Sequence, residues 1–78
     1  MEKRVKKVLN EISEEICKYQ GERLLEDRVI DSFDVMEIIA ALEEEFGFEI
    51  DANCVIIENF ENSKSIVMMM EKILKEKI

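Results

Sequence analysis

The sequence predicts an all-α fold, a small four-helix bundle of three long helices and one short helix, in a single domain over residues 1–78. Proline is absent and the only glycines are Gly21 and Gly47, so few residues interrupt a helix. Three stretches repeat apolar residues at the spacing of an amphipathic helix. The one strand-like alternation, at residues 48–50, is too short to form a sheet with the rest of the chain.

The first helix is expected over residues 2–19. Its apolar residues recur at i, i+3, i+4, i+7 and i+11, which places them on one face; they are Val5, Val8, Leu9, Ile12 and Ile16. Gly21 marks the exit from this helix. Residues 20–31 lack a clean periodicity, which indicates a long loop over the core. The apolar residues expected to anchor this loop are Leu24, Leu25, Val29 and Ile30.

The second helix, over residues 32–46, repeats the spacing of the first and ends at Gly47, a suitable C-terminal cap. Its apolar face is formed by Val35, Ile38, Ile39, Leu42 and Phe46. A loop follows, and residues 53–58 are expected to form one short helical turn. A last helix is capped by Asn62 or Ser63. Its apolar face is formed by Ile66, Val67, Met70, Ile73 and Leu74.

The net charge of −8 is concentrated in one segment. Residues 26–49 contain nine acids and one base, Arg28, whereas the remainder is neutral. This field repels nucleic acid and anionic membranes and attracts basic protein surfaces. On charge alone, a solubilising face is the simpler interpretation.

Neither an export signal nor a membrane-spanning run is visible, so we expect a cytoplasmic protein with no membrane insertion. Cys17 and Cys54 are expected to be free thiols among the core residues. The absence of histidine and of any zinc-site spacing predicts no metal site.

Three apolar residues of the second helix, Phe33, Met36 and Ala40, fall outside its core face, beside Glu37 and Glu44. The arrangement indicates a partner-binding surface with an apolar centre and an acidic rim. The alternative is that these side chains pack against the loop or the short helix, which is as plausible for Phe33 taken alone.

Ser32 stands at the start of this helix, after Asp31 and before Asp34. The usual role of Ser and Asp there is to cap backbone N–H groups, and Asp31 with Asp34 resembles a capping box. The same helix end would also favour a phosphodiester on Ser32.

The run Val29-Ile30-Asp31-Ser32-Phe33-Asp34, with Glu37 and then Leu42-Glu43-Glu44-Glu45-Phe46-Gly47-Phe48-Glu49-Ile50, resembles the acyl carrier protein family over essentially the whole chain. The resemblance implies that Ser32, flanked by Asp31, receives 4'-phosphopantetheine from coenzyme A. It also implies that the second helix, with Asp34, is the main recognition surface.

The chain departs from the family pattern at three places. Arg28-Val29-Ile30 stand where many members have a glycine, Phe33 replaces the commoner leucine, and Asp51 replaces a proline. The triplet Asp-Ser-Phe also resembles D-alanyl carrier proteins and carriers for polyketide or peptide assembly.

The resemblance implies a non-enzymatic, monomeric carrier of acyl or aminoacyl thioesters for fatty-acid, polyketide or related biosynthesis. Its partners would be a phosphopantetheinyl transferase, a loading enzyme, and downstream transferases or synthases. A D-alanyl or other aminoacyl carrier is one alternative. An unmodified acidic helical adaptor on a basic partner surface is another, and it would tolerate Ser32→Ala. A cation on Asp31 and Asp34 is the weakest interpretation, because the alternating acids and central glycine of an EF-hand are absent.

Overall fold

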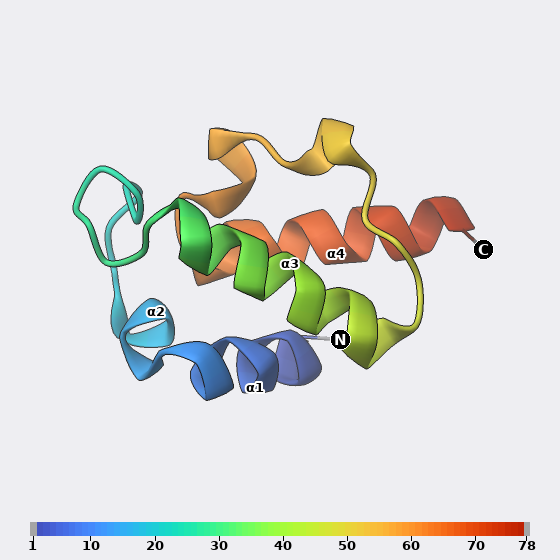
Figure 1. The fold of residues 1–78 in the computed structure, drawn as a ribbon, viewed down its shortest axis with the longest axis horizontal. Coiled ribbons are helices and arrows are strands. Elements are labelled where there is room, and N and C mark those ends of the chain that lie inside the picture. The colour runs from blue at the N-terminus through green and yellow to red at the C-terminus, as the bar shows by residue number, and fades with distance from the viewer. Residues whose placement is uncertain (1, 78) are drawn as a thin grey trace.

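Helix α1 packs against both α3 and α4, and it runs in roughly the opposite direction to them (Figure 1). The computed structural model describes residues 2–77. Its elements are α1 (Glu2–Ile12), α2 (Glu14–Lys18), α3 (Ser32–Phe46), the 3₁₀ turns η1 (Ala52–Cys54) and η2 (Ile57–Phe60), and α4 (Ser63–Lys77). The predicted all-α class is confirmed, with three long α-helices and one short one among the described residues.

The three predicted apolar faces point into one core. Most of their residues are buried, with exposed fractions below 10%: Val5, Val8, Leu9, Ile16, Val35, Ile38, Leu42, Ile66, Val67, Met70 and Ile73. Ile12, Ile39 and Phe46 are half-buried against this core, and Leu74 is half-buried. Helical periodicity therefore identified which side of each long helix faces inward.

The predicted single helix over residues 2–19 is wrong, because the chain breaks at Ser13. This residue has an extended backbone (φ −160°, ψ 124°) and serves as the N-cap position of α2. Serine has a low helix propensity and favours that position. The apolar spacing gives no sign of the break, since Ile16 is fully buried on the far side of it.

The loop over residues 20–31 is anchored to the core, as predicted. Leu24 and Ile30 are buried, while Leu25 and Val29 are half-buried against the core. The Leu24 N–H donates to the Glu61 carbonyl at 3.1 Å, and the Asn62 side-chain amide donates to the Gly21 carbonyl at 3.1 Å. These bonds tie the loop to the chain just before α4.

The Tyr19 hydroxyl organises the first half of this loop. It donates to the Asp27 carboxylate at 2.5 Å and accepts from the Arg23 N–H at 2.8 Å. The bond to Asp27 raises the pKa of Tyr19 above its ordinary value. A Cβ at Gly21 would collide with the Tyr19 ring and hydroxyl, so a larger residue there would displace the Tyr19 side chain.

Helix α3 ends where the glycine signal predicts. Gly47 has a left-handed backbone (φ 74°, ψ 26°), and its N–H donates to the Glu43 carbonyl at 2.8 Å. The Glu43 carboxylate then accepts the N–H of Ile50 at 2.8 Å, which turns the chain back toward the core. Residues 48–50 form a loop, as expected.

The segment between α3 and α4 differs from the predicted single turn over residues 53–58. It forms η1 and η2, separated by an extended Ile56 (φ −126°, ψ 155°). The break has a physical cause, since the run Val55-Ile56-Ile57 is β-branched throughout and disfavours continuous helix. The short α-helix of the fold is therefore α2 rather than this segment.

Asn62 is the cap of α4. Its side-chain oxygen accepts the N–H of Ser65 at 2.8 Å and the Ser65 hydroxyl at 3.1 Å. Of the two predicted caps, the structure selects Asn62 rather than Ser63, which is itself buried.

Both cysteines are free thiols, as predicted, and both are half-buried against the core. Burial raises the pKa of the Cys17 thiol, and nearby Lys6 partly opposes this shift. None of the described helices is both long and apolar enough to cross a membrane.

Candidate functional site

Ser32 is the first residue of α3, and the helix start is built by its neighbours. The Asp31 carboxylate accepts the N–H of Asp34 at 3.0 Å, and the Asp34 carboxylate accepts the N–H of Asp31 at 3.0 Å. This reciprocal pair confirms the predicted capping box. Capping therefore falls to the two aspartates, and the exposed Ser32 side chain takes no part in it.

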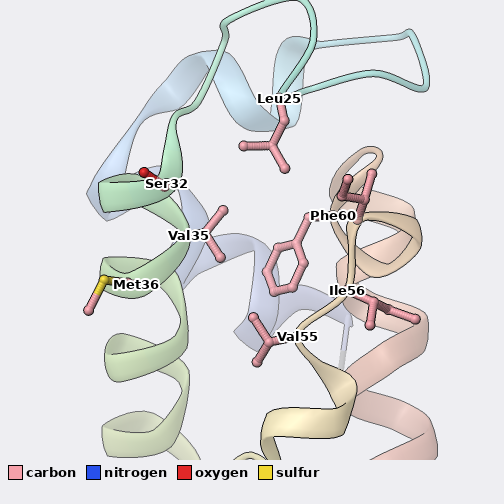
Figure 2. A pocket seen from close by; sticks show the side chains of 8 residues that line it. Leu25, Ser32, Val35, Met36, Val55, Ile56 and Phe60 are labelled. Carbon is pink, nitrogen blue, oxygen red and sulfur yellow. The ribbon is translucent and has the colours of Figure 1, made fainter.

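Ser32 lies on the rim of a groove of about 320 Å³ between α3 and the segment before α4. Figure 2 shows Val35 and Phe60 pointing toward each other across this groove, with Leu25 reaching in from the loop. The lining residues are Leu25, Ser32, Val35, Met36, Val55, Ile56, Ile57 and Phe60. Ser32 is thus the one polar residue on an otherwise apolar groove.

The four serines of the chain differ in accessibility. Ser63 is buried, with an exposed fraction of 9%, and the Ser65 hydroxyl is bonded to Asn62. Ser13 is half-buried at the break between α1 and α2. Ser32 alone is exposed, and it stands at the start of a long helix, where N–H groups and the helix dipole favour an anion.

The residues predicted to bind partners lie on α3, and most of them are exposed. Phe33 is 75% exposed and Met36 is 68% exposed, so the alternative that Phe33 packs against the loop is wrong. Glu37, Ala40 and Glu44 are also exposed, whereas Asp34 is half-buried and engaged in the capping box.

The groove residues missed from the sequence include Val55, Ile56 and Ile57. They line the wall opposite α3 and are 38%, 47% and 67% exposed. Their signal was three consecutive apolar residues in a segment without helical periodicity. That pattern alone does not tell an exposed run from a buried one.

The carboxylates of this region do not gather around a cation. Asp31 and Asp34 bind each other's backbone. Within residues 2–77 there is no cluster of three or more His, Cys, Asp or Glu side chains arranged to hold a metal ion.

Comparison with known proteins identifies a family. A family model described as the phosphopantetheine attachment site matches residues 6–69, which is most of the chain. Comparison with curated proteins gave no match, and comparison with solved structures also gave none. The family match confirms the resemblance to acyl carrier proteins and the predicted cofactor. The chain therefore belongs to the phosphopantetheine-attachment family of acyl-carrier-type domains, which hold 4'-phosphopantetheine covalently on a serine.

Proposed function

We propose that Ser32 is the attachment serine and that the whole chain, residues 1–78, is one carrier domain. The observation that carries this proposal is the position of Ser32: exposed, first in α3, and on the rim of an apolar groove. The protein acts as a monomeric, cytoplasmic carrier without catalytic activity of its own.

The start of α3 suits a phosphodiester at Ser32. The aligned peptide dipoles of a 15-residue helix place partial positive charge at this end. Asp31 and Asp34 bring negative charge nearby, but each carboxylate accepts a backbone N–H, which offsets part of its repulsion toward a phosphate.

Modification proceeds by attack of the Ser32 hydroxyl oxygen on the coenzyme A phosphorus next to pantetheine. A bond forms between that oxygen and phosphorus, the pyrophosphate bond breaks, and adenosine 3',5'-bisphosphate leaves. The transferase takes up the hydroxyl proton and supplies the metal ion. Once attached, phosphopantetheine provides the terminal thiol that holds cargo as a thioester. The chain itself then needs only to present the arm to successive enzymes.

The groove favours an aliphatic acyl cargo. An acyl chain gains about 25 cal/mol for each Å² of apolar surface that leaves water, and seven of the eight lining residues offer apolar side chains. The lining contains no carboxylate that could pair with the positive charge of an aminoacyl group. We therefore infer an acyl carrier for fatty-acid, polyketide or related biosynthesis, with a D-alanyl or other aminoacyl carrier as the alternative.

The exposed face of α3 serves as a recognition surface for the transferase, the loading enzyme and the downstream transferases or synthases. Phe33, Met36 and Ala40 supply apolar contacts, and Glu37 and Glu44 supply the acidic rim. A partner with complementary basic residues would be steered toward this face.

The deciding experiment is intact-mass analysis after incubation with coenzyme A, magnesium and a broad-specificity phosphopantetheinyl transferase. Wild type and Ser13→Ala should each gain one phosphopantetheine, and Ser32→Ala should gain none. Failure of folded wild type with several transferases would instead favour the unmodified acidic adaptor.

A further inference from the structure

Arg28, in the loop before α3, has a left-handed backbone with φ 59°, and no other non-glycine residue in the described part of the chain has a positive φ. Any side chain with a Cβ is strained in this conformation, and glycine is the residue that adopts it freely. Hydrogen bonds of the turn hold the backbone there. The Arg28 N–H donates to the Leu25 carbonyl at 3.2 Å. The N–H groups of Val29 and Ile30 both donate to the Leu24 carbonyl, at 3.0 and 3.3 Å. An arginine therefore stands at a position whose backbone suits glycine.

No contact of the Arg28 side chain offsets this strain. Arg28 is exposed, and within residues 2–77 its guanidinium takes part in no ion pair or hydrogen bond. Arg23, earlier in the same loop, differs in this respect, because its guanidinium lies 3.7 Å from the Glu26 carboxylate. A strained residue without a stabilising contact of its own points to a role outside the fold.

The charge around Arg28 indicates what that role is. Residues 24–63 contain twelve acids and one base, which is Arg28. It follows Leu25 by three residues and precedes Ser32 by four, and both of these residues line the groove. Four residues span at most about 14 Å when fully extended, and the turn shortens this path. The loop lies at the end of the molecule where α3 begins (Figure 1). The one cation of the acidic stretch is thus close along the chain to the proposed attachment serine.

Given the proposed attachment at Ser32, we propose that Arg28 binds the phosphodiester that joins phosphopantetheine to this serine. That group adds a negative charge beside Asp31 and Asp34, whose carboxylates repel it. A guanidinium presents paired donors that match two phosphate oxygens. The contact anchors the first atoms of the arm beside the loop and leaves the thiol end free.

The first test compares two arginines of the same loop. Arg28→Gln and Arg23→Gln each remove one positive charge, and Arg23 is the matched control because it already pairs with Glu26. Each protein is unfolded in urea with and without the arm, which is attached by exhaustive incubation with the transferase. Attachment should lower the folding equilibrium constant of Arg28→Gln by about threefold relative to its effect on wild type or Arg23→Gln. High salt should remove this difference, because the groups are exposed.

Phosphorus NMR of the modified protein observes the phosphodiester directly and needs no enzyme activity. Its resonance should move in Arg28→Gln and stay at the wild-type position in Arg23→Gln. Without the arm, Arg28→Gly should be at least as stable as wild type, because glycine relieves the left-handed backbone. A clear loss of stability in that variant would show that the arginine supports the loop itself, and it would overturn the inference.

The remaining outcomes separate this inference from the proposed function. An unmoved phosphorus resonance in Arg28→Gln, or an equal movement in Arg23→Gln, overturns the contact and leaves Ser32 as the attachment site. Wild type that no transferase modifies, or that carries its phosphopantetheine on another serine, overturns both proposals.

Discussion

Arg4 on α1 binds Glu45 at the end of α3 through both the side chain and the backbone. Its Nε donates to the Glu45 carboxylate at 3.0 Å, and a terminal nitrogen donates to the Glu45 carbonyl at 2.9 Å. The guanidinium carbon also lies 4.4 Å from the centroid of the Phe46 ring. A cation on the last carbonyls of a helix is favourable. This contact joins the start of the chain to the end of α3 farthest from Ser32.

Arg4→Lys should lower the free energy of unfolding by about 1 kcal/mol. Lysine keeps the charge but loses the two-point donation and the flat stacking on Phe46. Urea denaturation at low salt measures the loss, and high salt should reduce it because the pair is exposed. Lys7→Ala, on an exposed position of the same helix, should change little. Equal stability of Arg4→Lys and wild type would contradict the prediction.

Leu42→Ala should lower the free energy of unfolding by about 2–5 kcal/mol, because Leu42 is fully buried and the deletion leaves a cavity. Thermal and urea unfolding would measure this directly. Met36→Ala, on the exposed side of the same helix, should change stability by less than about 0.5 kcal/mol. A Leu42→Ala variant as stable as Met36→Ala would show that α3 faces the core differently.

Two substitutions of Asp31 separate the effect of its helix cap from the effect of its negative charge. Asp31→Ala removes the acceptor of the Asp34 N–H and should cost about 1 kcal/mol, whereas Asp31→Asn keeps an acceptor and should be nearly neutral. Stability by urea denaturation should follow this order. If Asp31 supports modification only through the cap, transfer to Ser32 in Asp31→Asn should proceed at the wild-type rate. A slow but fully stable Asp31→Asn would assign its charge a part in recognition.

Reversal of charge at Glu37 or Glu44 to lysine should slow phosphopantetheine transfer and weaken its dependence on salt. Both glutamates are exposed on α3, where they attract basic transferase residues over a range set by ionic strength. Glu71→Lys, on an exposed position of α4, controls for the change in net charge. Rates that fall equally in all three variants would mean that only the overall charge matters.

Cys17 should react slowly with iodoacetamide in the folded protein. Burial raises the pKa of its thiol, so less reactive thiolate exists at a given pH than in the unfolded chain. In a Cys54→Ser background, mass spectrometry should show faster labelling in urea than in buffer. The folded protein should reach half its maximal rate at a higher pH. Identical pH profiles in both states would contradict the shift.

The parts of the fold that the sequence predicted well are those fixed by local chemistry. Helix α3 has the predicted bounds because Asp31 and Asp34 mark its start and Gly47 marks its end. The buried faces followed from spacing alone. The break at Ser13 was missed because helical spacing continues across it, and one extended residue leaves no trace in the apolar pattern.

Only the part of the candidate site that lies on α3 could be predicted from the sequence. Ser32 and the exposed face of α3 belong to one helix, so the helical period alone gives the relative directions of their side chains. The groove needs α3 and residues 55–60 to be placed relative to each other, and that placement depends on long-range packing. The exposure of Val55, Ile56 and Ile57 is a property of this packing, and no local pattern encodes it.

The two sides of the groove are held in place by different kinds of contact. Helix α3 is held by buried Ile38 and Leu42 and by its contact with α1. The hydrogen bonds within residues 51–59, by contrast, join groups no more than five residues apart, and the stretch is held to the rest of the molecule by packing of η2 against α4 and of Cys54 against the core. It can exchange its amide hydrogens by a local opening that leaves the three long helices intact. A molecule that fills the groove bridges a wall held by long-range packing and a wall whose hydrogen bonds are local, so it should slow that exchange within residues 51–59.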